Sequence, residues 1–156
     1  MFRKMRLFNK QADNEECISI LKSAPRGVLA LLGDEGYPYT VPMDFVYDDG
    51  SIYFHSALSG HKVDAIKNYD KASFCVLSDG VRNEGEWWYN FTSVIAFGRI
   101  KIVEDEKKAI EKLKLLGLKY FPEDIDVDED VNNNHHKIFC VELKIEHLTG
   151  KHIAEK

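Results

Sequence analysis

The chain is organised around one segment, Ile52-Tyr53-Phe54-His55-Ser56-Ala57-Leu58-Ser59-Gly60-His61-Lys62. Its first half alternates like a β-strand, and its second half leads into a short helix. Free backbone N–H groups and a partial positive charge at a helix N-terminus favour a bound phosphate. Gly60 lets a ligand approach the backbone, while Ser56, Ser59, His61 and Lys62 can add hydroxyl donors and charge. The segment therefore predicts a phosphate site. The alternative is that Ser59 only caps the helix and that Lys62 is a solvated surface residue.

The residues before this segment predict an antiparallel meander. Residues 27–32 are an apolar run of strand length, residues 33–36 supply a turn, and residues 37–47 return as a second strand. A further turn at residues 48–50 leads into a third strand over residues 51–56. Pro38 and Pro42 lack an N–H donor for a strand ladder, so we expect them at a sheet edge, at a bulge or at the mouth of a site.

Capping residues and apolar spacing predict three helices. Asp13 and Glu16 resemble a capping box, after which an apolar stripe runs to Pro25. A second short helix carries its apolar residues within residues 63–66, and a third covers residues 105–120. Residues 122–136 are acidic and polar and predict an exposed loop.

The remaining strands are predicted at residues 72–77, 87–104 and 137–148, which makes six in all. Hairpins outnumber helical crossovers, so a mainly β fold is expected, with an antiparallel sheet that forms a small barrel flanked by helices. A length of 156 residues, 44% of them hydrophobic, favours a single domain over residues 1–156.

Composition argues against several classes of partner. The net charge of -5 gives no basic surface for nucleic acid, and no apolar run approaches the roughly 20 residues that span a bilayer. We therefore expect a cytoplasmic protein without nucleic-acid or membrane partners. Cys17, Cys75 and Cys140 lie far apart, which predicts neither a disulfide framework nor a zinc site but small buried residues.

Other candidate sites are weaker. His55 is one ring in a strand, and such a histidine is more often structural than catalytic. Asp124, Asp126 and Asp128 match the first ligands of a calcium loop, but the glycine and the glutamate required later in that loop are missing, so no metal is expected. The aromatic residues at positions 87–91 could line a planar ligand, or they could be core or dimer contacts.

Several motifs, taken together and in order, resemble one family. They are the glycine-led strand at residues 27–31, the segment Gly36-Tyr37-Pro38-Tyr39-Thr40-Val41-Pro42-Met43, the hairpin at residues 45–50, the strand Ile52-Tyr53-Phe54-His55-Ser56-Ala57, the corner Gly60-His61-Lys62 and the later strand at residues 93–98. This set resembles the pyridoxamine 5′-phosphate oxidase-related flavoproteins, particularly the nitroimidazole-resistance (nitroimidazole reductase)-like branch. The resemblance covers residues 27–104 well and the flanks more loosely.

The resemblance implies a six-stranded split β-barrel that forms a homodimer and binds FMN, or less often FAD, in clefts between the subunits. It places Val41, Pro42, Met43 and Asp44 beside the flavin ring, and His55, Ser56 and Ala57 along the neighbouring strand. It also places Gly60, His61 and Lys62 at the flavin phosphate. Ser93 and Val94 are further cofactor-binding candidates, contributed across the dimer.

The function implied by this resemblance is a flavin-dependent oxidoreductase. NADH or NADPH would be the transient electron donor, the acceptor would be a small molecule, with a nitro-aromatic such as a 5-nitroimidazole as one candidate, and His55 would be the catalytic residue. The vitamin oxidase activity itself is not expected, because the last residues differ from the basic segment with which that enzyme ends. The alternatives are a flavin carrier or sensor without turnover, and a split barrel that binds haem or a deazaflavin.

Overall fold

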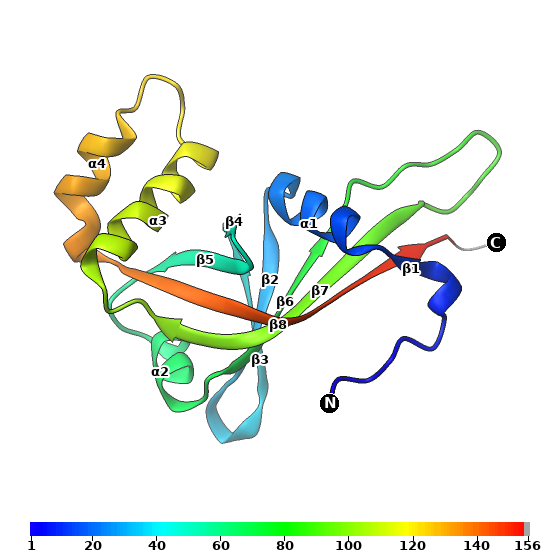
Figure 1. The fold of residues 1–156 in the computed structure, drawn as a ribbon, viewed down its shortest axis with the longest axis horizontal. Coiled ribbons are helices and arrows are strands. Elements are labelled where there is room, and N and C mark those ends of the chain that lie inside the picture. Colours follow the sequence, from blue (N-terminus) through cyan, green and yellow to red (C-terminus); the bar gives the residue numbers. More distant parts are fainter. Residues whose placement is uncertain (155–156) are drawn as a thin grey trace.

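The computed structural model describes residues 1–154, and its centre is one antiparallel sheet (Figure 1). The strand order is β3-β2-β6-β7-β8-β5-β4, and the short β1 pairs with β8 outside that path. The strands are β1 (Gln11–Ala12), β2 (Gly27–Leu32), β3 (Pro38–Met43), β4 (Val46–Asp48), β5 (Ser51–Ser56), β6 (Lys71–Leu77), β7 (Phe91–Ile102) and β8 (Phe139–Ile153).

The sheet curls because its two edge strands are neighbours in the chain. β3 and β4 lie at opposite ends of the strand order, yet only residues 44–45 separate them. The long strands β7 and β8 pair over most of their length and bend at a bulge between Phe97 and Gly98. A Cβ atom on Gly98 would lie 2.0 Å from the carbonyl oxygen of Lys144, so only glycine permits this close approach of the two strands. The result is a mainly β split barrel, as predicted.

The core fills the inside of the curl. Alternating side chains of β2, β6 and β7 point inward, and the rings of Phe45 and Phe54 both meet Phe74 edge to face, with centroids 4.7 Å and 5.1 Å apart. All three rings are fully buried. Burial of large aromatic side chains in this geometry stabilises the barrel.

Helices cover the openings of the barrel (Figure 1). α1 (Asn14–Ser23) is capped by Asp13, which accepts a hydrogen bond from the backbone N–H of Glu16, as the sequence predicts. α2 (His61–Asn68) follows β5, and it buries Val63 and Ile66. α3 (Glu106–Tyr120) begins at the cap Asp105 and packs with α4 (Val127–Asn134) over the end of the barrel that carries β5. Short 3-10 turns lie at Phe8–Lys10, Asp34–Gly36 and His135–Lys137.

The prediction of an exposed loop over residues 122–136 is wrong, because α4 occupies most of it. Asp126 caps the helix by accepting a hydrogen bond from the N–H of Glu129, and Val131 is buried. Val127 packs closely on α3, where a Cβ on Gly117 would lie 2.7 Å from its Cγ1. Two valines four residues apart were enough for a helical face, although acidic residues dominated the composition.

Other boundaries also differ from the prediction. The described residues form eight strands rather than six, because β1 was not foreseen and the expected strand at residues 37–47 divides into β3 and β4. β7 begins at Phe91, so Trp87 and Trp88 lie in the loop before it. Both prolines lie in the edge strand β3, which pairs only with β2, as expected. No helix among residues 1–154 is long and apolar enough to cross a membrane.

Candidate functional site

A cleft of about 300 Å³ lies where β3, β5 and α2 meet. It is lined by Arg26, Pro42, Met43, Asp44, His55 and Lys62. Five of these six residues were predicted as site residues from two segments of the sequence, residues 41–44 and residues 52–62, and the fold brings them together. The strands supply the walls, and the start of α2 supplies one end.

Lys62 is a partly buried cation in this cleft. Its Nζ donates a hydrogen bond to Sδ of Met43 at 3.4 Å, and burial lowers the pKa of the ammonium group. Among residues 1–154, no carboxylate forms an ion pair with it. A thioether is a weak acceptor, so an anion in the cleft would be a much better partner for Lys62.

The N-terminus of α2 is open beside Lys62. The N-cap residue is Gly60, with φ +114° and ψ 172°, and no side chain in the described part of the chain caps the helix. The expectation that Ser59 caps it is therefore wrong: the cap position falls on the next residue, whose backbone is in a region that only glycine adopts readily. A Cβ on Gly60 would meet nothing within 4 Å, so this corner has free space for a ligand.

His61 is turned away from this cleft in the structure. Its ring stacks on Tyr39 with centroids 4.1 Å apart, and its Nε2 accepts a hydrogen bond from the backbone N–H of Asp34 at 3.2 Å. The imidazole therefore bridges α2 to the turn between β2 and β3. Its role at a phosphate stays a prediction that would require the side chain to rotate.

The other predicted residues lie around the cleft without lining it. Val41 is half-buried against the core, and Ala57 is exposed just after β5. Ser56 is buried, and its Oγ has no hydrogen-bond partner among the described residues. Ser93 is half-buried on the outer face of β7, whereas Val94 is fully buried in the core, so only its backbone could meet a ligand.

Arg26 is a lining residue that sequence reasoning missed. Its Nε lies 2.7 Å from Oδ1 of Asp44, and the hydrogen bond with that carboxylate raises the pKa of the guanidinium. The hairpin register contains the signal, because Gly27 pairs with Met43 and the residues just outside that pair must also be neighbours.

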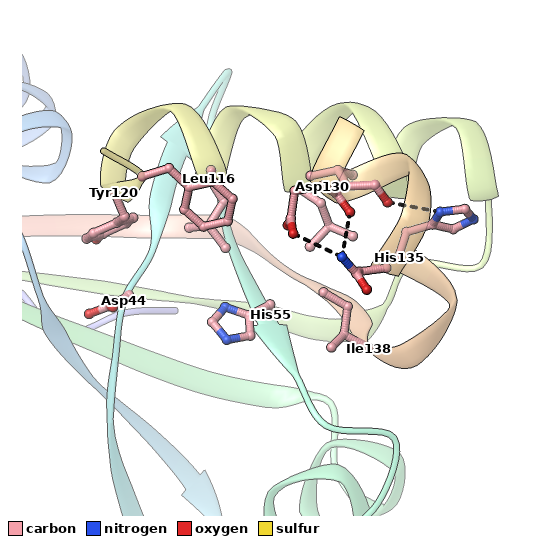
Figure 2. A pocket seen from close by; sticks show the side chains of 12 residues that line it. Asp44, His55, Leu116, Tyr120, Asp130, His135 and Ile138 are labelled. Atoms are coloured by element: carbon pink, nitrogen blue, oxygen red, sulfur yellow. Dashed lines mark hydrogen bonds between the residues drawn. The ribbon is translucent and has the colours of Figure 1, made fainter. Parts of the chain in front are cut away.

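A second cavity of about 250 Å³ shares Asp44 and His55 with the cleft (Figure 2). Figure 2 shows the His55 ring projecting from β5 below α3, between Asp44 and Ile138. The remaining lining residues come from those helices and the segment that follows them: Leu113, Leu116, Gly117, Tyr120, Phe121, Asp130, Val131, Asn134, His135 and Ile138. None of these residues was predicted as part of a site.

The end of α3 is fastened to the corner between β3 and β4. The Nζ of Lys119 donates to the carbonyl oxygens of Ala24 and Phe45 at 2.8 Å and 3.0 Å. The hydroxyl of Tyr120 donates to the carbonyl of Pro25 at 2.7 Å and accepts from the N–H of Phe45 at 3.0 Å. Burial lowers the pKa of Lys119 and raises that of Tyr120. These contacts fix the helical wall of the second cavity next to the cleft.

Cysteine and metal chemistry find little support in the described part of the chain. Cys17 and Cys140 are buried as predicted, whereas Cys75 is half-buried. Burial raises the pKa of all three thiols, that of Cys140 to about 12, which makes them poor nucleophiles. Residues 1–154 contain no group of three or more histidine, cysteine or acidic side chains placed to hold a metal ion.

Comparison with solved structures shows the same fold in several bacterial proteins. A proposed 5-nitroimidazole antibiotic resistance protein from Bacteroides thetaiotaomicron is 21% identical, with a TM-score of 0.75, over 90% of this chain and 84% of that one. A flavocytochrome from Azotobacter vinelandii is 20% identical, with a TM-score of 0.76, over 98% and 73% of the two chains. An FAD-binding protein from Mesorhizobium loti is 20% identical, with a TM-score of 0.66, over 92% and 97%.

No curated protein matches the chain significantly. The family model described as pyridoxamine 5′-phosphate oxidase matches residues 13–152, which is most of the chain. That match and the curled antiparallel barrel agree with the resemblance carried by the sequence motifs. The chain therefore belongs to the pyridoxamine 5′-phosphate oxidase family.

Proposed function

We propose that the protein is a flavin-dependent oxidoreductase that uses FMN to reduce a small acceptor. The observation that carries this proposal is the partly buried Lys62, which lines the cleft and whose Nζ has, among residues 1–154, only the sulfur of Met43 as a hydrogen-bond partner. Similar proteins described as an FAD-binding protein and a flavocytochrome support a flavin as the ligand.

The residues present fit the two ends of a flavin mononucleotide. Lys62 and the uncapped N-terminus of α2 would hold the phosphate, since both offer positive potential and N–H donors. Pro42, Met43 and Asp44 would shape the environment of the ring from β3 and the residue that follows it. Bound flavin would supply two-electron transfer between a nicotinamide donor and an acceptor.

His55 is the proton donor in this proposal. It projects from β5 into the space shared by the cleft and the second cavity, and Figure 2 shows no hydrogen bond from its ring to the other residues drawn. The ring would hold a proton at one nitrogen and give it to the reduced acceptor, with solvent restoring that proton. NADH or NADPH would provide the two electrons.

A nitro-aromatic such as a 5-nitroimidazole is the acceptor class that we propose to test first. Its support is the fold shared with the proposed nitroimidazole resistance protein. FAD is the alternative to FMN, and a carrier or sensor without turnover is the alternative to an enzyme.

A homodimer belongs to the same proposal. The outer face of the sheet carries apolar side chains in register across three strands, where Val28 pairs with Cys75 and Cys75 pairs with Ile95. Leu77 is 54% exposed on the same side of β6. An apolar sheet face of this kind is typical of a protein interface, and Ser93 on the same face is the residue that we propose contacts the flavin of a second copy.

An absorption spectrum of the purified protein tests the proposal. We expect bound flavin, or uptake of added FMN, and bleaching of the flavin band by NADH or NADPH followed by reoxidation with a nitro-aromatic acceptor. Protein that neither contains nor takes up FMN or FAD would contradict the flavin assignment. A bound flavin that no nicotinamide donor reduces would favour the carrier or sensor.

A further inference from the structure

The cavity under α3 and α4 is a mainly apolar chamber beside the proposed flavin cleft. Leu113 and Leu116 line it from α3, Val131 from α4, and Ile138 from the segment before β8. Asp44 and His55 line both the chamber and the cleft, so we take them as the mouth of the chamber; Figure 2 shows the two side chains. Any molecule in the chamber would therefore present one edge to the cleft.

Most polar groups in the wall are already bonded within the protein. Tyr120 is bonded to the backbone of Pro25 and Phe45, and Asp130 accepts from Nδ2 of Asn134 at 2.9 Å. These groups offer little to a ligand, because they would have to give up an internal hydrogen bond first. His55 at the mouth is the polar group best placed to bind a ligand.

The charges near the chamber select against anions. Asp44 lies at the mouth, where its charge is paired with Arg26 at 2.7 Å, and Asp130 lies in the wall with an amide rather than a cation as its partner. His135 is bonded through Nε2 to Glu106 and through Nδ1 to the carbonyl oxygen of Val131. An anion would lose its hydration to apolar walls, would find no unpaired cation among the described lining residues and would approach the carboxylate of Asp130.

The size of the chamber limits its occupant to one or two rings. An apolar cavity of about 150 Å³ is known to hold benzene. The present volume of about 250 Å³ leaves room for a substituent or for a second fused ring. Apolar walls with one polar group at the mouth are the usual composition of a small-molecule site.

We propose that this chamber is the acceptor pocket, and that it takes flat, uncharged, mainly apolar molecules of one or two rings with a polar edge that meets His55. The inference rests on the proposed function, since it names the substrate class of that site. The acceptor would bind under α3 and α4, and uncharged acceptors would bind more tightly than anionic ones.

The test is binding of two probes of nearly the same shape, 4-fluorobenzamide and 4-fluorobenzoate, to the full-length protein. Binding is followed by ¹⁹F NMR, with and without saturating FMN, so that no turnover is needed. We expect the neutral amide to bind and the anionic carboxylate to bind at least about tenfold more weakly, since desolvating an unpaired charge costs well over 1.4 kcal/mol. Equal or tighter binding of the carboxylate would overturn the proposed preference for uncharged molecules.

Two variants that fill the chamber from different walls locate the binding. Leu116→Phe acts from α3 and Ile138→Phe acts from the opposite wall, while Leu118→Phe, at a side chain on α3 that is 69% exposed, is the matched control. We expect both filling variants to reduce amide binding at least about fivefold, because overpacking a filled site costs about 1–3 kcal/mol, and the control to bind like the wild type. The circular dichroism spectrum of each filling variant should match that of the wild type. If such a folded variant still binds the amide with wild-type affinity, the amide does not bind in the chamber.

The same samples separate this inference from the proposed function. FMN binding by the filling variants should equal that of the wild type, and its loss in both would show that the flavin ring itself fills the chamber, which would overturn the inference. Flavin bound without any amide binding would leave the oxidoreductase standing and remove the acceptor pocket. Amide binding by a protein that takes up no flavin would leave the chamber standing as a binding site and would remove the proposed oxidoreductase function.

Discussion

The Nζ atom of Lys62 lies 3.4 Å from Sδ of Met43, at the point where the first turn of α2 meets the end of β3. A half-buried ammonium group beside a thioether has lost water without gaining a good acceptor, and its pKa is lowered by burial. Lys112, by contrast, meets Asp48 at 2.8 Å, and the partly buried Lys119 donates to two carbonyl oxygens, so the arrangement at Lys62 is consistent with a site prepared for an anion.

His55→Gln should separate cofactor binding from turnover. We expect FMN affinity to stay within about twofold of the wild type, because glutamine keeps a polar side chain of similar reach, and kcat for acceptor reduction to fall about 100-fold, the usual contribution of a proton-transferring group. Steady-state kinetics and FMN titration measure the two effects. His136→Gln, at an exposed histidine after α4, is the control and should leave both unchanged. Full turnover in His55→Gln would remove His55 from the catalytic role.

Gly60→Ala should weaken both the fold and the phosphate corner. The backbone φ of +114° is strained for any residue with a Cβ, so we expect the free energy of unfolding to fall by about 1–3 kcal/mol. The added methyl group also enters the open space beside Lys62, so FMN should bind more weakly. Chemical denaturation and FMN titration measure the two effects.

Gly85→Ala is the matched control for Gly60→Ala, because it also has a positive φ, of +81°, and open space around its Cβ, but lies in the loop before β7. It should lose stability without losing FMN affinity. A Gly60→Ala protein with wild-type FMN affinity would show that the phosphate does not lie at this corner.

Glu142 makes stability depend on pH. Its carboxylate is 4% exposed and accepts hydrogen bonds from Ser51, Tyr53 and Lys108. Burial alone would raise its pKa, but these donors outweigh burial and lower the pKa below the ordinary value of 4.5. The stabilisation is therefore present above the unfolded-state pKa and is lost as the pH falls through the folded-state pKa.

Glu142→Gln should cost about 1–3 kcal/mol of unfolding free energy at pH 7 and should make the acid limb of stability shallower. Urea denaturation between pH 3 and 7 checks both expectations, over a range of roughly four units around the carboxylate pKa. Glu146→Gln, which removes a half-exposed partner of Arg99, should cost much less. Equal losses for the two variants would contradict the role given to Glu142.

Leu77→Glu should dissociate the proposed homodimer. Leu77 is 54% exposed on the apolar outer face of β6, and a carboxylate there would be buried without a partner in an interface. Light scattering after size-exclusion chromatography should report a dimer for the wild type and a monomer for the variant. Ile125→Glu, at a residue 44% exposed beside α4, should remain dimeric. A dimeric Leu77→Glu protein would place the interface elsewhere.

Local patterns predicted much of the fold. The apolar run at residues 27–32 and the turns at residues 33–36 and 48–50 predicted the hairpins, and Asp13 predicted the start of α1. The break between β3 and β4 was missed because Asp44 and Phe45 leave the sheet for tertiary reasons: Phe45 enters the core and its backbone bonds to Tyr120, 75 residues later in the sequence. α4 was missed because acidic composition hid two valines at helical spacing.

Some residues of the candidate site could be predicted from local sequence, and others could not. His55 and Lys62 lie in one continuous segment, so a local reading could identify them, and Arg26 could have been found from the hairpin register. Leu116 and Ile138 could not, because their place beside His55 depends on how α3 and α4 pack against the barrel from distant parts of the sequence. The packing of these helices against the barrel cannot be predicted from local sequence patterns.

Paired titrations with FMN and riboflavin are the sharpest test of the claim that Lys62 holds the phosphate of a flavin mononucleotide. Lys67→Ala, at an exposed lysine of the same helix, is the matched control. We predict that Lys62→Ala weakens FMN binding at least about tenfold, as expected for loss of a charge-assisted hydrogen bond, and leaves riboflavin binding unchanged, while Lys67→Ala changes neither. Equal losses of FMN and riboflavin affinity in Lys62→Ala, or no loss of either, would contradict the claim.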